Sequence, residues 1–412
     1  AAGGSASGGG AASGGGAAGG AASGGGTGAG AAFKQLSAGN FHTCAVNAAG
    51  QGYCWGKGDD GQLGTPSSIM ANAPIAVVSP DGGAPLTFVS IVAGGFHSCG
   101  LTTTGEAYCW GKNGNGQLGD GKNSQSSARP VPVASPDGGA PLQFTQLATG
   151  TNHTCGIATS GAAYCWGNND SKQVSSLNNA FLRFPVPVPA PSGGQSLTFT
   201  ELSAGTSYTC GLSGGGAYCW GSNSEKQLGN GSPSTASTPT KVLGADGGTP
   251  LVFSSLSAGQ THACGMSGGA PYCWGSNTYG QLGNGSKTPA PFPTPVSVPG
   301  GVTFTQVTAG SHYVGLTFTC ARSTTGAAYC WGNGTSSQLG NGLMMDSPTP
   351  VAVSAPAGGS ALSFTSLSAG GLHGCGLLAD DSAYCWGSGG NGQLGQGTPA
   401  NSPVPVKVAA PN

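Results

Sequence analysis

One short pattern recurs seven times along the chain: a cysteine, a gap of eight or nine residues, and a second cysteine followed at once by Trp-Gly. Successive tryptophans are 54 to 57 residues apart. A fixed period of this length indicates one repeated supersecondary unit, and it constrains the architecture before any single residue is interpreted. The pairs are Cys44 with Cys54, Cys99 with Cys109, Cys155 with Cys165, Cys210 with Cys219, Cys264 with Cys273, Cys320 with Cys330 and Cys375 with Cys385, and the tryptophans are Trp55, Trp110, Trp166, Trp220, Trp274, Trp331 and Trp386.

Each unit alternates strand-like segments with turn residues. In the second unit, residues 86–92 alternate between apolar and polar, and Ala-Gly then leads to a strand with the first cysteine. Tyr-Cys-Trp-Gly forms a third strand, Gly-Gln-Leu-Gly follows, and residues 130–133 form a Pro/Val strand after a variable loop. Four short strands between Gly, Asn and Pro turns predict one blade. Seven units predict an all-β, seven-bladed β-propeller of four-stranded blades.

The two ends of the repeat region predict a closed ring. Residues 33–39 match the first strand of the unit, and residues 403–408 supply a Pro/Val strand at the other end. We expect the N-terminal and C-terminal strands to pair, because pairing hides two sheet edges that would otherwise recruit foreign strands. The predicted domains are a Gly/Ala/Ser-rich arm over residues 1–32 and the propeller over residues 33–412.

The cysteine spacing predicts seven disulfides within the blades. Cys44 and Cys54 are centred on one hairpin turn, so their sulfurs can lie opposite each other across antiparallel strands. Each such link would contribute about 2.7 kcal/mol by loop-closure entropy. Strand alternation places Tyr53 and Trp55 on the other face, towards the gap between blades. Seven zinc sites are the alternative, but each needs four ligands and the unit offers two cysteines and one histidine.

The motifs Ala-Gly-x-x-His-Thr-Cys, Tyr-Cys-Trp-Gly and Gly-Gln-Leu-Gly-x-Gly together resemble the repeat of the regulator of chromosome condensation family. The resemblance covers residues 33–408 and implies a seven-bladed propeller. It implies little about function, because the family includes nucleotide-exchange factors, inhibitors and adhesion modules. The cysteine pairs are similar to those of its exported bacterial branch, which includes secreted β-lactamase inhibitor propellers. The basic tail expected of a chromatin binder has no counterpart here.

Charge and hydropathy exclude several classes of partner. The formal net charge is −1 with only 12 Lys and Arg, so nothing offers a basic surface to nucleic acid. No apolar run approaches the roughly 18 residues that a membrane helix needs. The chain begins at Ala1, which we interpret as a processed form whose export signal has been removed. Evenly paired cysteines indicate an oxidising compartment, so we expect an extracellular or cell-surface protein.

The histidines and acidic residues are the remaining candidates for sites of chemistry. His42, His97, His153, His262, His312 and His373 follow the Ala-Gly turns, but equivalent atoms around a ring are too far apart to share one metal ion. Asp59-Asp60-Gly61 and Asn169-Asp170-Ser171 lack the later ligands of a calcium loop. No nucleophile with a base emerges from the sequence. We therefore expect no catalytic residues, no metal, no cofactor and no enzymatic activity.

Large side chains interrupt the polar loop and strand after Gly-Gln-Leu-Gly. Equivalent loops of a propeller emerge on one face, so we expect these side chains to cluster there and bind a protein partner. The alternative is that each one covers its own blade. The predicted partner-binding residues are Ile69, Met70, Arg129, Phe181, Leu182, Arg183, Phe184, Phe292, Met344 and Met345.

The arm gives the second hypothesis of function. Residues 1–30 contain 15 Gly, 10 Ala, four Ser and one Thr. Such a segment is a flexible tether or, if its bare backbone packs against a neighbouring copy, the contact of a homo-oligomer. A head-to-tail contact of that kind that does not close gives a filament. The sequence thus predicts a protein-binding propeller, with an extracellular filament subunit as the alternative.

Overall fold

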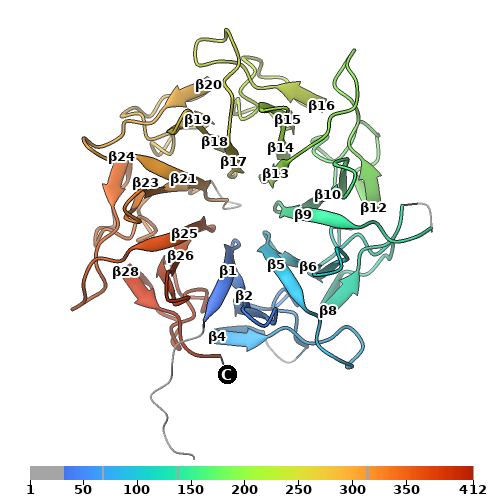
Figure 1. Ribbon diagram of the computed structural model, residues 1–412, viewed down its shortest axis with the longest axis horizontal. Helices are drawn as coiled ribbons and strands as arrows, with labels where there is room; N and C mark the ends of the chain where they lie inside the picture. The colour runs from blue at the N-terminus through green and yellow to red at the C-terminus, as the bar shows by residue number, and fades with distance from the viewer. Residues whose placement is uncertain (1–31, 67–68, 137–138, 312–314, 412) are drawn as a thin grey trace, which may run out of the picture.

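Seven four-stranded antiparallel sheets surround a central axis in this computed structural model (Figure 1). The structure describes residues 32–66, 69–136, 139–311 and 315–411. Within these ranges every regular element is a β-strand. The all-β, seven-bladed propeller predicted from the repeat is confirmed.

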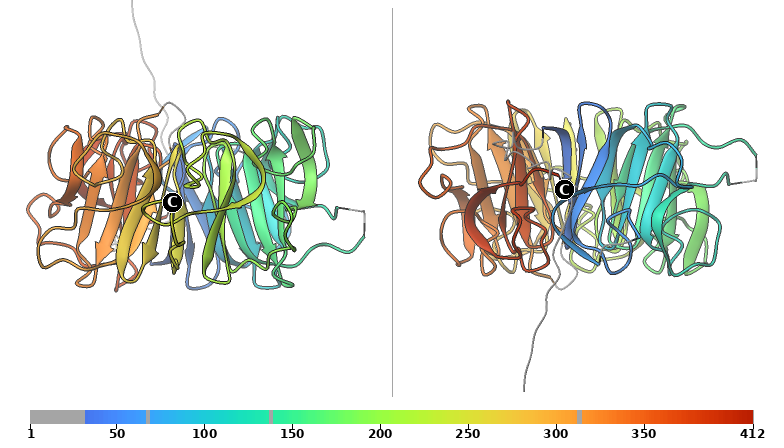
Figure 2. Two further views of the ribbon diagram at one scale, coloured as in Figure 1. Left: turned by 90° about the horizontal axis from the view of Figure 1, so that it is seen from above. Right: turned by 90° about the horizontal axis from the view of Figure 1, so that it is seen from below.

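The blades form a short, wide ring when seen from the side (Figure 2). The innermost strands surround the axis in Figure 1 and consist of β1 (Phe33–Ala38), β5 (Phe88–Ala93), β9 (Phe144–Thr149), β13 (Glu201–Ala204), β17 (Ser255–Ala258), β21 (Phe304–Ala309) and β25 (Phe364–Ala369). The second strands, which carry the first cysteines, are β2 (His42–Asn47), β6 (His97–Thr102), β10 (His153–Ala158), β14 (Tyr208–Ser213), β18 (His262–Ser267), β22 (Phe318–Ser323) and β26 (His373–Leu378).

The outer half of each blade carries the second cysteine, the tryptophan and the Pro/Val segment. The third strands are β3 (Gly52–Lys57), β7 (Ala107–Lys112), β11 (Ala163–Asn168), β15 (Gly216–Gly221), β19 (Ala270–Gly275), β23 (Ala328–Gly332) and β27 (Ala383–Gly387). The outermost strands are β4 (Met70–Ala76), β8 (Ser126–Pro132), β12 (Phe181–Pro187), β16 (Ala236–Lys241), β20 (Ala290–Pro295), β24 (Ser347–Ala352) and β28 (Ser402–Lys407).

The predicted disulfides are confirmed and link the second and third strands of every blade. In each hairpin the two cysteines lie directly opposite each other in the strand register, and the Cα atoms of the bonded pairs lie 4.0 to 4.1 Å apart. The bonds join Cys44 to Cys54, Cys99 to Cys109, Cys155 to Cys165, Cys210 to Cys219, Cys264 to Cys273, Cys320 to Cys330 and Cys375 to Cys385.

All fourteen cysteines of the sequence are used in these bonds. No cysteine is therefore left as a thiolate ligand, and the alternative of seven zinc sites is wrong. The disulfides support a setting that is oxidising rather than reducing.

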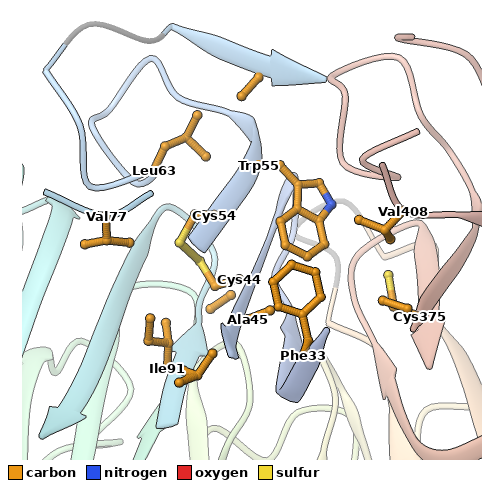
Figure 3. Packing of buried hydrophobic residues seen from close by; sticks show 14 of the residues in the cluster. Phe33, Cys44, Ala45, Cys54, Trp55, Leu63, Val77, Ile91, Cys375 and Val408 are labelled. Carbon is orange, nitrogen blue, oxygen red and sulfur yellow. A yellow bond between two sulfur atoms is a disulfide. The ribbon is translucent and has the colours of Figure 1, made fainter. Parts of the chain in front are cut away.

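A small apolar core fills each junction between neighbouring blades. At the junction of the second and third blades, the disulfide of the second blade and Leu118 contact Phe144, Leu147 and Trp166 of the third. The equivalent junctions of the first blade appear in Figure 3, where Phe33 and Trp55 lie towards Cys375 and Val408 of the last blade. Each tryptophan is fully buried, and each disulfide lies on the opposite face of its sheet. One blade alone therefore cannot bury its apolar faces.

The ring closes, but the predicted pairing of terminal strands is wrong. Strands β1 to β4 form one sheet and β25 to β28 form another, so every blade consists of consecutive strands. Short local hairpins complete each sheet, and the first and last blades then meet face to face as any other neighbours do. Backbone hydrogen bonds from Phe33 to Asp381 and from Gly371 to Gly39 join them, together with an ion pair between Lys34 and Asp381.

The glycines of the Ala-Gly turns form a closed ring around the axis, which we name the glycine ring. At every member, an added Cβ atom would lie no more than 2.7 Å from the carbonyl oxygen of the next member. This contact explains why the turn has glycine in all seven units, because any side chain would collide with the neighbouring backbone. The members are Gly39, Gly94, Gly150, Gly205, Gly259, Gly310 and Gly370.

Replacing one member of the glycine ring with alanine should destabilise the propeller. In Gly94→Ala the new methyl group would lie 2.7 Å from the oxygen of Gly150, and overpacking of this kind costs about 1–3 kcal/mol. Gly390→Ala is the matched control, because nothing lies within 4 Å of that position. Urea unfolding monitored by tryptophan fluorescence would measure both. Equal stability of the two variants would contradict the argument.

Candidate protein-interaction surface

The predicted histidines join neighbouring blades through hydroxyl groups. His97 Nε2 lies 2.8 Å from Thr154 Oγ1 of the next blade, and that hydroxyl donates to the carbonyl oxygen of Gln117 at 2.9 Å. Since its one proton is used in this bond, the threonine accepts from His97, which places the imidazole proton on Nε2. The same contact joins His42 to Ser98, His153 to Thr209, His262 to Thr319 and His373 to Thr43.

Burial keeps these imidazoles neutral. The five described histidines are fully buried, and desolvation lowers the pKa of each from 6.5 to about 3. Their Nδ1 atoms have no hydrogen-bond partner among the described residues, so a proton there would be an uncompensated buried charge. The histidines therefore act as neutral structural links. His312, which the sequence placed in this set, lies outside the described residues, and Phe318 occupies the strand position in its blade.

The histidine and its partner hydroxyl change together within this one chain. In the fourth blade Tyr208 replaces the histidine, and the fifth blade has Ala263 in place of the hydroxyl residue. In the sixth blade Phe318 replaces the histidine, and the seventh has Gly374. A larger ring thus faces a smaller residue, and the Tyr208 hydroxyl donates to the backbone oxygen of His262 instead. The junction keeps a similar volume even where its chemistry changes.

The predicted partner-binding residues lie within the first four positions of outermost strands, or just before such a strand, in five blades. They belong to β4, β8, β12, β20 and the segment before β24, so they are spread around the rim and do not form the single expected cluster. The longest continuous stretch of predicted residues is 181–184, where the Arg183 guanidinium lies 4.7 Å from the Phe181 ring centre and donates to Asn123. Leu182 packs against the apolar core between its own blade, the third, and the fourth blade.

Several of these side chains contact the preceding blade. The Phe184 ring covers Gly121, and the Phe292 ring covers Gly231 and Gly247. Arg129 Nη1 donates to the carbonyl oxygen of Ser79 at 3.0 Å. These three residues therefore have structural contacts that account for their size, and their binding of a partner stays a prediction.

The remaining predicted side chains are freely exposed and apolar. Ile69 is 78 % exposed, Met344 62 % and Met345 68 %, and Met70 is 44 % exposed. Leu343, which the sequence reasoning missed, is 56 % exposed and completes a run of three apolar residues before β24. Its position beside the two methionines was the available signal. We name residues 69, 70, 343, 344 and 345 the exposed apolar group; they lie on the first and sixth blades, with the seventh between them.

The axis of the ring contains a cavity of about 300 Å³ lined by the innermost strands. Its lining is neutral except for Glu201, and it includes Gln146, which donates to and accepts from the backbone of Leu202 in the next blade. Gln35 and Gln306 make the same pair of bonds at the equivalent positions of the first and sixth blades. Glu201 takes the glutamine position in the fourth blade and accepts from Leu256 N at 2.9 Å. Desolvation raises the pKa of this carboxyl, against the opposing effect of that hydrogen bond. The cavity thus offers hydrogen bonds rather than charge.

No group of three or more His, Cys, Asp or Glu side chains that could hold a metal occurs in the described ranges. Asn169, which belongs to one of the two candidate calcium fragments, is buried, and its amide binds the backbone of its own loop. Over the same residues, no helix is long and apolar enough to cross a bilayer.

Comparisons with known proteins agree with this geometry. A family model described as the RCC1-like domain matches residues 25–373, and models of the regulator of chromosome condensation repeat match residues 364–393 and 380–412. The chain is 28 % identical to the ultraviolet-B receptor UVR8 of Arabidopsis thaliana over 91 % of this chain and 81 % of that protein. It is 27 % identical to the human E3 ubiquitin-protein ligase HERC2 over 68 % of this chain, but over only 6 % of HERC2.

Solved structures show the same fold. The structure of human WBSCR16 superposes with a TM-score of 0.75 at 19 % identity, over 87 % of this chain and 94 % of that one. Yeast RCC1 (Prp20) bound to Kap60 superposes with a TM-score of 0.71 at 18 % identity, over 92 % and 85 %. The family resemblance inferred from the motifs is confirmed, whereas the assignment to an exported bacterial branch stays a prediction.

The buried histidines should make the stability of the propeller depend on pH. Their folded pKa of about 3 lies below the unfolded value of 6.5, so between these values the unfolded chain binds more protons. The stabilising contribution is complete above pH 6.5 and falls with the pH, by about 1.4 kcal/mol per pH unit and histidine at most. We expect the urea midpoint to fall steeply from pH 6.5 to pH 4.

A matched variant isolates one histidine. His97→Phe with Thr154→Gly copies the natural pair Phe318 and Gly374, and it should reduce the slope of unfolding free energy against pH by about one proton. A urea midpoint that is constant from pH 7 to pH 4 would show that the histidines are not buried in the neutral form.

Proposed function

The chain belongs to the RCC1-like domain family, and from this premise we propose that it is a non-enzymatic, exported propeller that recognises a protein partner. The observation that carries the proposal is the exposed apolar group on the first and sixth blades. Runs of exposed large apolar side chains, here residues 69–70 and residues 343–345, are typical of interaction sites on a protein surface. Yeast RCC1 (Prp20), which has this fold, was solved bound to Kap60, so one protein that contains such a propeller has a protein partner.

The proposed location follows from the disulfides. Seven of them, one in every blade, are stable where thiols are not kept reduced. We therefore place the protein outside the cytoplasm, in secreted or surface-bound form. With a net charge of −1, the partner surface is expected to be apolar and neutral rather than strongly charged.

Removing the sixth-blade part of the exposed apolar group should abolish partner binding without unfolding the ring. The triple variant Leu343→Ser, Met344→Ser, Met345→Ser loses three side chains that are more than half exposed. If they form a binding site, the lost burial amounts to several kcal/mol, or more than a hundredfold in Kd. Quantitative affinity capture from extracellular fractions of the source organism would compare the variant with the unaltered chain.

Val252→Ser is the matched control for this experiment. Val252 is 72 % exposed but lies in the connection between β16 and β17, outside the exposed apolar group. Capture should be lost with the triple variant and retained with the control. Equal capture by all three proteins would overturn the proposal.

A structural subunit of an extracellular filament is the second candidate. It is supported by the composition of residues 1–30, which contain no side chain larger than threonine and so permit close backbone approach along their whole length. Deleting residues 1–30 should convert filaments to single propellers in negative-stain electron microscopy. Filaments that persist after the deletion, or an intact chain that sediments as a monomer at every concentration, would return the arm to a tether.

A further inference from the structure

A repeated backbone contact supports the outer rim at five of the blade junctions. The second glycine of Gly-x-Gly, after the Gln-Leu turn, donates its N–H to a carbonyl oxygen in the outermost strand of the next blade. These bonds join Gly121 to Arg183, Gly231 to Pro291, Gly285 to Pro348, Gly342 to Pro403 and Gly397 to Asn72, at 2.8 to 3.2 Å. The five junctions therefore share one backbone framework.

We name the residue after this carbonyl the wedge residue. Its side chain occupies the outer end of the junction between the two blades. Phe184 and Phe292 lie over the donor glycines of the preceding blades, and Thr349 lies 3.9 Å from the position of a Cβ on Gly285. At two further junctions the equivalent residues make polar contacts: Arg129 binds Ser79, and Thr238 lies 3.3 Å from Ser192. The outer junction therefore accepts side chains up to the size of phenylalanine.

The seam between the last and first blades has the smallest wedge residue. Ala73 is the equivalent of Phe184 and Phe292. In each of these blades, the residue two positions later lies opposite the second cysteine in the strand register; these residues are Ile75, Val186 and Thr294. No described atom lies within 4 Å of an added Cβ on Gly397, and the same is true of Gly342, where the wedge residue is Val404. The seam instead has a groove of about 410 Å³, which we name the seam groove, lined by Met70, Ala71, Asn72, Ala73, Ile75, Gly397 and Ala409.

We propose that the seam groove binds an aromatic side chain of a protein partner, which takes the place that phenylalanine has at two other junctions. The backbone framework at the seam is the same, because Gly397 still donates to Asn72 at 2.8 Å. The difference lies in the wedge side chain, which is the methyl group of Ala73 where Phe184 and Phe292 have a phenyl ring. An aromatic ring is the occupant that this framework already accommodates within the same molecule, over Gly121 and Gly231.

The rim of the seam groove has the chemistry to hold such a ring. Met70 lines the groove and is 44 % exposed, and Ile69 beside it is 78 % exposed. Thioether sulfur makes favourable contacts with aromatic rings. A pocket for one aromatic anchor with an exposed apolar rim is the arrangement of a binding hot spot. This inference rests on the proposed function and identifies the partner by its aromatic anchor.

Methyl NMR of the whole chain can test the seam groove directly. The sequence has four methionines, of which Met70 lines the groove, Met266 is buried in a junction, and Met344 and Met345 are exposed on the sixth blade. The protein labelled at the methionine methyl carbons would be titrated with N-acetyl-L-phenylalaninamide. We expect the Met70 signal alone to shift and to saturate in the millimolar range, and N-acetyl-L-alaninamide to shift it at least tenfold less.

Two variants complete the test. Ala73→Phe fills the groove from within, so the Met70 shift should disappear and the thermal midpoint should not fall. Thr349→Phe makes the same change at the equivalent position of another blade and should leave the shift intact. The proposal is overturned if Met70 does not respond in the unaltered chain, if Met344 and Met345 shift equally, or if the response persists in Ala73→Phe. The unaltered chain alone decides the matter if a variant does not fold.

This result is independent of the capture experiment. A Met70 response together with unchanged capture by the triple Leu343, Met344 and Met345 variant would leave the seam groove standing and remove the proposed role of the sixth blade. Loss of capture by the triple variant without a Met70 response would support the role of the sixth blade and overturn the seam groove proposal.

Discussion

The ring depends on one acceptor in each blade, the backbone carbonyl oxygen of the glutamine in the Gly-Gln-Leu-Gly turn or its equivalent. It receives the indole N–H of the next blade at 2.9 to 3.0 Å at six junctions, as from Trp110 to Gln62. At five junctions it also accepts a hydrogen bond from a Ser or Thr hydroxyl of the next blade. This is the same hydroxyl that the histidine of the glutamine's blade contacts. Because all these atoms are buried, losing the acceptor would leave up to two donors unpaired at a cost of about 1–3 kcal/mol each. The glutamine oxygen therefore couples every blade to the next.

The third blade shows what the turn sequence contributes. There Ser175 takes the position of the last glycine, and at the six other junctions an added Cβ at this position would lie 2.5 to 3.0 Å from the next indole nitrogen. At this junction the Trp220 N–H has no partner in the part of the chain that the structure describes, although Thr209 still donates to Gln173. The glycine is thus required for the approach of the tryptophan as well as for the turn. One departure is tolerated because the neighbouring contacts remain.

The sequence predicted the parts of the fold that depend on local spacing. Cys44 and Cys54 could be placed opposite each other because positions in a hairpin have a constant sum, and blade number follows from the period. The sequence predicted a closed ring but not which contacts close it, because a cyclic repeat pattern does not show where one sheet ends and the next begins. Arg129, Phe184 and Phe292 were recognised as large, with cover of their own blade as the alternative to partner binding. Their contact with the preceding blade was not foreseen, because Phe184 and Gly121 are brought together only by a junction between blades. The seam groove was invisible for the same reason: an alanine in a strand is unremarkable until its equivalents are known to be phenylalanine.

The bond between Trp55 and Gln393 spans 338 residues and has a consequence for how the protein is made. Ribosomes add about 5–20 residues per second, so roughly 17 to 70 seconds separate the synthesis of the indole from that of its acceptor. During this interval the first blade has a complete hairpin but an uncovered face that contains Phe33 and Trp55. A truncated chain would expose the same face permanently and would be prone to aggregate. The first blade therefore obtains its last neighbour only when the seventh blade has been synthesised.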